Sequence, residues 1–177
     1  MVVVVVLERP VLWHRATVTV TERSTPTERH RFVLGCRITP MTRFDADTPT
    51  ERRKLFAEAV TAHRKRGSPF LTVEIASDPA LDGTDDDGDP LPGPWIQFAE
   101  KTFNLDVTDD ERERLEALLD DFREFRIDEV SSPEESEGTN VRITARSDAN
   151  RLAGFVDRAF QEVYGRDEDY RAWVTQV

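Results

Sequence analysis

The chain has 177 residues, of which 38% are hydrophobic, so it can bury the core of one domain and wholesale disorder is not expected. Its 35 acidic and 24 basic residues give a net charge of −11, which argues against nucleic acid as a partner because binding phosphates needs a basic surface. The single Cys36 cannot form an internal disulfide, and the apolar run 2–7 is too short for a membrane span, so we expect a cytoplasmic location without membrane contact.

The first forty residues differ in charge from the rest of the chain. Residues 1–40 carry six arginines and three glutamates, a net charge of +3, which leaves −14 for residues 41–177. Two interpretations are open: Met41 is the native start and the preceding stretch is an over-extended gene model, or residues 1–40 are a genuine basic arm. The strands of such an arm are expected at 2–7, 11–20 and 31–38. The charge reversal favours the first interpretation, with residues 41–177 as a single domain.

Three amphipathic helices follow Met41, each marked by its capping residues. The expected N-caps of the first two helices are Thr48 and Thr108, Ser147-Asp148 opens the third, and glycines end the first helix at Gly67 and the third at Gly165. In the first two helices a glutamate three residues after the threonine completes a capping box. Each helix should therefore place one apolar face on a common core.

Strands are expected between these helices, where apolar and polar residues alternate. Their predicted ranges are 70–76, 95–100, 102–107, 125–130 and 140–146. The last two flank the polar loop 131–139 and predict a hairpin. A register that pairs residue 127 with residue 143 gathers their apolar side chains on one face, and it sets Asp128 opposite Arg142 on the other. The residues of the apolar face are Phe125, Ile127, Val141, Ile143 and Ala145.

We expect the aromatic tail after Gly165 to pack against other residues, because an exposed tryptophan side chain is energetically costly. It contains Tyr170, Trp173 and Val174. We expect a short helix that docks on the same chain, and association with another subunit is the alternative.

The predicted order after Met41 is α-β-β-β-α-β-β-α, which indicates an α+β fold with three helices gathered on one side of an antiparallel sheet. This order resembles the type III secretion chaperone-like fold, which includes the YbjN-like proteins. The resemblance covers about residues 48–165 and rests on element order. It implies a small unit that pairs with a copy of itself and binds protein partners without catalysis.

The surface chemistry indicates adaptation to concentrated salt. Lysine occurs only at Lys54, Lys65 and Lys101, so arginine supplies nearly all of the positive charge. An acidic surface with arginine in place of lysine resembles the proteins of extremely halophilic archaea. The Debye length falls from about 10 Å at 0.1 M salt to about 3 Å at 1 M, so the mutual repulsion of surface carboxylates largely disappears in molar salt.

No motif predicts a catalytic residue, a metal site or a cofactor. The loop 78–93 is rich in aspartate, but neither Gly83 nor Gly88 anchors the ligand spacing of an EF-hand, and we expect a disordered, solvated loop. His63 lies at the edge of the buried face of the first helix, where a packing role is expected rather than a ligand role. Neither a nucleophile elbow nor a glycine-rich phosphate loop is present in the sequence.

The residues best placed to bind a ligand are three arginines on the outer face of the predicted hairpin: Arg126, Arg142 and Arg146. They could receive an anionic ligand or an acidic segment, although cross-strand pairing with Asp128 competes with that role. The sequence favours a non-catalytic protein-interaction or chaperone-like module adapted to high salt, which associates with itself or with another protein. The alternative is a small regulatory domain that binds an anion through these arginines, and an enzyme is the third hypothesis.

Overall fold

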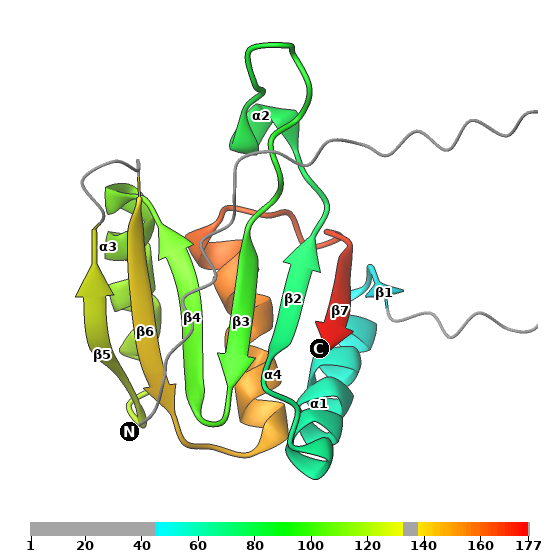
Figure 1. The fold of residues 1–177 in the computed structure, drawn as a ribbon, viewed down its shortest axis with the longest axis vertical. Coiled ribbons are helices and arrows are strands. Elements are labelled where there is room, and N and C mark those ends of the chain that lie inside the picture. Colours follow the sequence, from blue (N-terminus) through cyan, green and yellow to red (C-terminus); the bar gives the residue numbers. More distant parts are fainter. Residues whose placement is uncertain (1–44, 133–137, 177) are drawn as a thin grey trace, which may run out of the picture. The chain divides into compact units, whose positions relative to one another are not determined.

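The computed structural model describes residues 45–132 and 138–176, which belong to one compact unit. Figure 1 shows a twisted antiparallel sheet with helices packed against it. Along the chain the elements are β1 (Asp45–Ala46), α1 (Pro49–Arg66), β2 (Leu71–Ile75), α2 (Pro79–Asp82), β3 (Trp95–Ala99), β4 (Thr102–Val107), α3 (Asp109–Leu119), β5 (Phe125–Ser131), β6 (Thr139–Ala145), α4 (Ala149–Arg158), the π-helix η1 (Ala159–Val163) and β7 (Ala172–Gln176).

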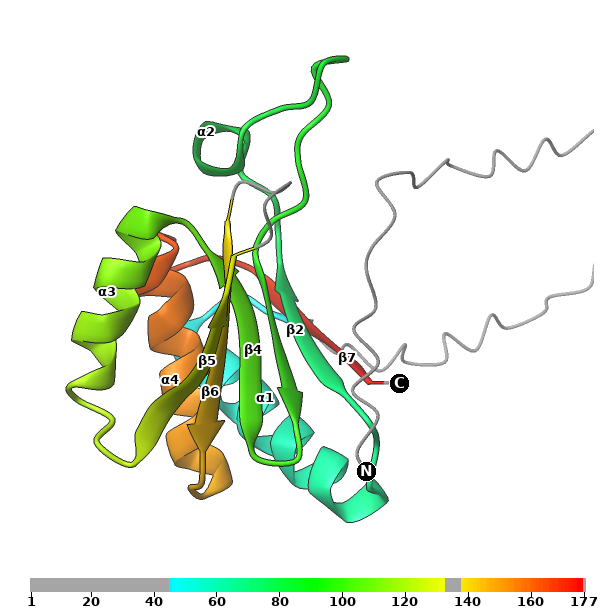
Figure 2. The ribbon, with the colours of Figure 1, turned by 60° about the vertical axis from the view of Figure 1, so that its left-hand side comes forward.

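Within residues 45–132 and 138–176, seven strands form one sheet in the order β1-β7-β2-β3-β4-β6-β5, and every neighbouring pair is antiparallel. Helices α1, α3 and α4 all lie on one face of this sheet (Figure 2). The predicted α+β class is confirmed, as are the five predicted strands and the three predicted helices. The structure adds β1, β7, the short α2 and η1, so the described residues form four α-helices rather than three.

The predicted caps explain where the helices begin. The hydroxyl of Thr108 accepts from the backbone N–H of Glu111 at 3.4 Å, and the Glu111 carboxylate accepts from the backbone N–H of Thr108 at 2.8 Å, which completes the capping box. Asp148 caps α4 through two backbone N–H groups. Gly67 ends α1 with φ 64°, a left-handed conformation that glycine adopts without a steric cost.

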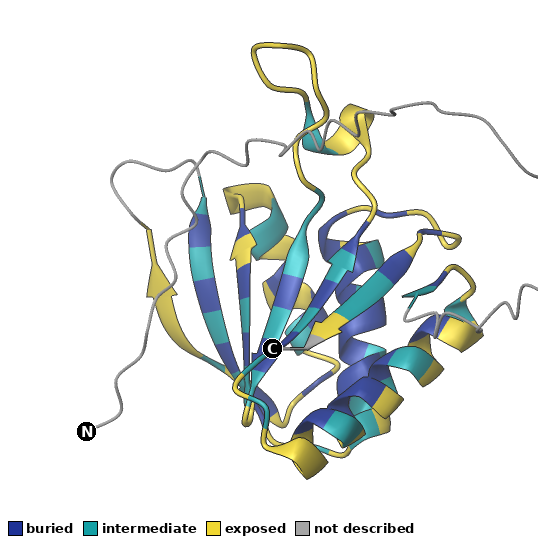
Figure 3. Cartoon of the chain, turned by 45° about the vertical axis from the view of Figure 1, so that its right-hand side comes forward, coloured by how far each residue is buried: buried dark blue, intermediate teal, exposed yellow. Residues whose placement is uncertain are grey.

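The core lies between the sheet and the three long helices. Buried and half-buried residues alternate along the strands (Figure 3), because successive side chains of a strand point to opposite faces. Phenylalanines fill the centre: the ring centroids of Phe103 and Phe155 lie 5.1 Å apart, and those of Phe122 and Phe155 lie 5.3 Å apart. The sheet face toward the helices is therefore the apolar one.

The β5–β6 hairpin confirms the predicted register at the end away from its connecting loop and departs from it toward the loop. Ile127 pairs with Ile143 as predicted, and the apolar set of the hairpin faces the core. A β-bulge between Ile127 and Glu129 then shifts the pairing, so Glu129 rather than Asp128 lies opposite Arg142. The predicted Asp128–Arg142 pair is wrong, because a bulge adds one residue to one strand only.

The aromatic tail docks on its own chain, but as a strand and not as a helix. Strand β7 inserts between β1 and β2 in the sheet. Its side chains alternate, with Ala172 buried and Val174 packed against the core, while Trp173 points to the other face. This period-2 pattern is that of a strand, so the predicted docking helix is wrong.

A buried arginine anchors the segment that leads into β7. Arg52 of α1 is fully buried, and its Nε lies 3.0 Å from the carboxylate of Asp157 on α4. Its other nitrogens donate to the backbone carbonyls of Asp47, Glu168 and Tyr170 at 2.8–2.9 Å. The guanidinium also stacks 3.7 Å from the centre of the Tyr170 ring, whose hydroxyl donates to Asp157. We call these residues the Arg52 clamp.

The acidic loop between β2 and β3 is exposed but has defined structure, so its predicted disorder is wrong. Helix α2 opens it, and an isolated bridge joins Thr84 to Pro90. The carboxylate of Asp85 accepts from two backbone N–H groups of the turn, and Asp82 pairs with the buried Arg166. In a disordered loop, the same groups would form hydrogen bonds to water instead.

Within the described part of the chain, no helix combines the length and the apolar character needed to cross a membrane.

Candidate functional site

The face of the sheet opposite the helices is the candidate functional site. Within the described residues no helix covers this face (Figure 2), which we call the open face. It is formed by the residues of each strand that alternate with the core residues. Among them are Thr72, Glu74, Trp95, Gln97, Thr102, Asn104, Asp106, Arg126, Glu129, Asn140, Arg142, Thr144, Trp173 and Thr175.

Two tryptophans flank a glutamate at one end of the open face. The strand registers place Glu74 directly opposite Trp95 on one side and directly opposite Trp173 on the other. The indole N–H of Trp173 donates to Oε2 of Glu74 at 2.8 Å, and all three side chains are half-buried. Neighbouring strands lie about 4.8 Å apart, so the two tryptophan backbones are about 10 Å apart with the glutamate between them. We call these residues the Trp–Glu–Trp cluster.

At the other end of the open face, polar side chains bond to one another. Arg142 donates to Glu129 at 2.8 Å, Asn140 donates to Asp106 at 2.7 Å, and the hydroxyl of Thr144 donates to Asp128. Burial of a polar group costs less free energy when the group already has a hydrogen-bond partner in the protein than when it has only water. A partner protein could therefore cover this half of the open face without leaving these polar groups unpaired.

The three predicted ligand-binding arginines do not form one open anion-binding site. Arg142 is bound to Glu129, and its side chain is 39% exposed. Arg126 and Arg146 are exposed; Arg126 lies opposite Thr144 on the open face, and Arg146 follows β6. All three belong to the hairpin or its end, and the acids Asp128 and Glu129 of the same hairpin share the surface. The arrangement suits a mixed polar surface better than a pocket for one anion.

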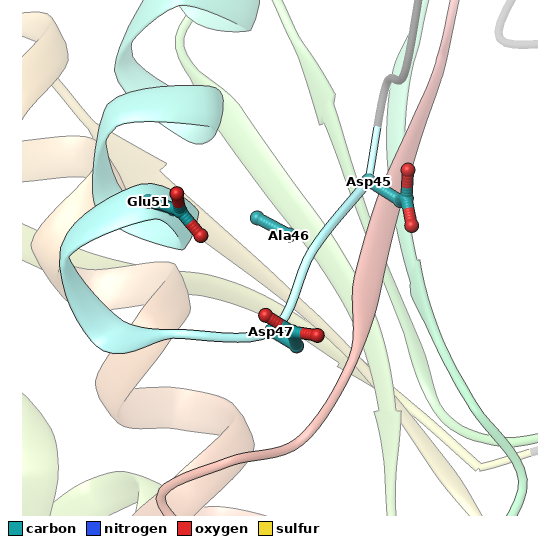
Figure 4. Close-up of a pocket in the computed structure, with 4 residues that line it drawn as sticks. All are labelled: Asp45, Ala46, Asp47 and Glu51. Atoms are coloured by element: carbon teal, nitrogen blue, oxygen red, sulfur yellow. The ribbon is translucent and has the colours of Figure 1, made fainter.

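A shallow pocket lies between β1 and the first turn of α1 (Figure 4). It has a volume of about 260 Å³ and is lined by Asp45, Ala46, Asp47 and Glu51. The Asp45 carboxylate pairs with Arg171, and the Glu51 carboxylate accepts from the hydroxyl of the N-cap residue Thr48. In the described ranges, no group of three or more histidines, cysteines and acidic residues has a metal-binding arrangement. The pocket is thus an exposed acidic recess whose groups serve the local structure.

His63 is buried in the core and 3% exposed. Its ring meets the Phe98 ring edge-on at 5.7 Å, and within the described residues Nδ1 has no hydrogen-bond partner. Burial, and then the adjacent Arg64 guanidinium, lower the pKa of His63 below its usual 6.5. Its position agrees with the predicted packing role.

Sequence reasoning missed the Trp–Glu–Trp cluster, although it had assigned two of its three strands. The alternation in 70–76 already placed Glu74 away from the core, and the strand 95–100 began at Trp95. The missing signal was the alternation of residues 172–175, which marks a strand, together with a reason to insert that strand beside β2. Strand order across a sheet is a long-range property that local periodicity does not specify.

The chain belongs to a protein family whose function is unknown (DUF7975), whose model matches residues 41–177. No curated protein and no solved structure matches the chain.

Proposed function

We propose that this chain, as a member of a family of unknown function, is a non-catalytic protein-interaction module adapted to high salt, and that its open face receives the partner. The observation that carries this proposal is a sheet with three helices on one face and two tryptophans on the other, with no helix over them among the described residues. Tryptophan and arginine are the residues most enriched among energetic hot spots of protein interfaces. The open face carries both.

The size of the open face indicates the kind of interface. Seven strands of about five residues cover roughly 30 Å by 17 Å, or about 500 Å². Stable complexes bury about 800 Å² on each partner. The open face alone is therefore smaller than a standard interface, and a complex of standard size would include contacts beyond the sheet. The partner is a second copy of the chain or another protein.

Adaptation to salt is supported by the ion pairs of the folded domain. Almost all of those seen among the described residues use arginine, as in the pairs of Arg158 with Asp121 and Glu162 and of Arg151 with Glu124. Arginine donates through a planar fork and is more weakly hydrated than lysine. Such pairs at the surface, together with a net charge of −14 on residues 41–177, fit a cytoplasm rich in salt.

The test is a matched pair of threonine-to-arginine variants studied in molar KCl. Thr72 lies in the middle of the open face, whereas Thr61 lies on the exposed side of α1. Light scattering coupled to chromatography reports self-association, and affinity capture from native lysate reports another partner. We expect Thr72→Arg to lose the complex and Thr61→Arg to retain it. A wild-type chain that stays monomeric and captures nothing, or a complex that Thr72→Arg leaves intact, would contradict the proposal.

The alternative, an anion-binding regulatory domain, has less support from the geometry. Its strongest feature is the exposed pair Arg126 and Arg146, since Arg142 is engaged by Glu129. It predicts that phosphate raises the melting temperature of the wild-type chain and not that of the Arg126→Ala variant.

A further inference from the structure

We propose that the Trp–Glu–Trp cluster is a binding site for a cationic side chain, arginine or lysine, presented by a basic segment of the protein partner. This inference rests on the proposed function and names the chemistry of the contact. It follows from the position of one carboxylate between two indole side chains on three adjacent strands.

The negative charge is held in place and is not neutralised within the described residues. Glu74 Oε2 accepts from the Trp173 indole N–H at 2.8 Å, which fixes the carboxylate on the sheet. Oε1 accepts no hydrogen bond, and no basic side chain pairs with Glu74, within the part of the chain that the structure describes. A carboxylate bonded through one oxygen keeps the other free for a charge-assisted bond to an incoming cation.

The two tryptophans supply the second component of cation recognition. A cation over an indole face is attracted by the negative face of the ring, and tryptophan gives the strongest such interaction among the aromatic side chains. Trp95 and Trp173 stand about 10 Å apart at the backbone, on either side of Glu74. A flat guanidinium above the carboxylate would therefore lie within reach of both rings. Arginine suits this arrangement better than lysine, because its planar fork can stack and donate at the same time.

The charge of the domain favours a basic partner. Residues 41–177 carry a net charge of −14, so a basic segment is attracted to the domain as a whole before it contacts the cluster. The cluster on the open face combines a carboxylate with two tryptophans.

The experiment uses the full chain in 0.5 M and 2 M KCl with a defined probe, the peptide acetyl-(Gly-Arg)3-amide. The matched probe carries citrulline in place of arginine, which keeps the shape and removes the charge. Binding is followed by the NMR signals of the indole N–H groups, which are assigned with Trp95→Phe and Trp173→Phe. We expect the arginine peptide to shift the Trp95 and Trp173 signals with saturation, and the citrulline peptide to bind about tenfold more weakly.

Two variants separate the cluster from the net charge of the domain. Glu74→Gln retains an oxygen for the Trp173 indole bond and removes the charge, so it should reduce affinity for the arginine peptide about tenfold while the fold is unchanged. Glu116→Gln removes one negative charge on α3, on the helix side of the sheet, and should bind as the wild type does. Equal affinities for Glu74→Gln and wild type would overturn the assignment, as would binding of tetramethylammonium without binding of the peptide.

The outcomes for the cluster and for the proposed function are distinguishable. If Thr72→Arg abolishes a complex that Glu74→Gln leaves intact, the open face is the interface and the cluster is not its cation site. If the arginine peptide shifts both indole signals but no protein complex depends on Thr72, the cluster binds cations and the proposed interaction function is wrong.

Discussion

Replacement of Arg52 by methionine tests how the C-terminal strand is anchored in the fold. Arg52 is fully buried and donates to the Asp157 carboxylate at 3.0 Å and to three backbone carbonyls at 2.8–2.9 Å. Methionine fills most of the volume but removes the buried cation that pairs with the Asp157 carboxylate, which is 6% exposed; the exposed Arg53 guanidinium stays 4.0 Å from that carboxylate. Removing one partner of a buried pair costs about 3–5 kcal/mol, which is a large part of the roughly 5–15 kcal/mol that stabilises a domain.

The assay is urea unfolding in molar KCl, followed by circular dichroism. We expect Arg52→Met to lower the free energy of unfolding by about 3–5 kcal/mol, and the double variant Arg52→Met/Asp157→Leu to recover part of the loss because no lone charge stays buried. Arg112→Met is the control. It removes an exposed pair with Glu116 on α3 and should cost less than about 1 kcal/mol. A loss below 1 kcal/mol for Arg52→Met, or no recovery in the double variant, would refute the reasoning.

Three further predictions address salt, pH and the N-terminal residues. The free energy of unfolding should rise steadily as KCl increases from 0.1 M to 3 M, because screening removes carboxylate repulsion; a salt-independent urea midpoint would contradict the halophilic interpretation. The lowered pKa of His63 means that the unfolded chain binds its proton more tightly, so stability contributed by the neutral ring should be present above pH 6.5 and lost as the pH falls below it. His63→Leu should flatten the difference between pH 7.5 and pH 5.5, and an unchanged profile would exclude His63 as its source. A chain that begins at Met41 should keep the urea midpoint of the full chain, because the family match covers residues 41–177, and a lower midpoint would show that residues 1–40 contribute to the fold.

The elements that local sequence predicts correctly are those whose signals are local. The N-cap at Thr48 and the capping box at Thr108 depend on residues three positions apart, and the hairpin register depends on two neighbouring strands; at Thr48 the Glu51 carboxylate bonds to the threonine hydroxyl and not to its backbone N–H, so the predicted box there is incomplete. The bulge at Asp128 was not predictable from alternation, because either side of the hairpin can absorb an extra polar residue. Local rules therefore gave the elements of the fold but not each of its pairings.

The candidate site was less predictable than the fold, since it joins residues far apart in the chain. The three hairpin arginines could be grouped from the sequence because they lie within about twenty residues of one another. The ion pair of Arg142 with Glu129 could not be predicted in the same way. Trp173 is about a hundred residues from Glu74, and only the insertion of β7 beside β2 makes them neighbours. The segment that leads into β7 is held by the Arg52 clamp, a buried charge that alternation and charge counts alone do not predict.

The clamp and the open face are physically connected through β7. Arg52 fixes the carbonyls of Glu168 and Tyr170, and the next residues along the chain enter the sheet and place Trp173 beside Glu74. Replacement of Arg52 should thus increase the mobility of β7, which carries Trp173 of the Trp–Glu–Trp cluster, without changing any residue on the surface. Hydrogen exchange of the amides of 172–175 measures this coupling. In Arg52→Met these amides should exchange faster than those of β4, at urea concentrations well below the unfolding midpoint, because β4 is paired on both sides by strands that the clamp does not contact. Equal acceleration in β4 and β7 would mean that the variant lowers global stability alone, and that the open face does not depend on the clamp.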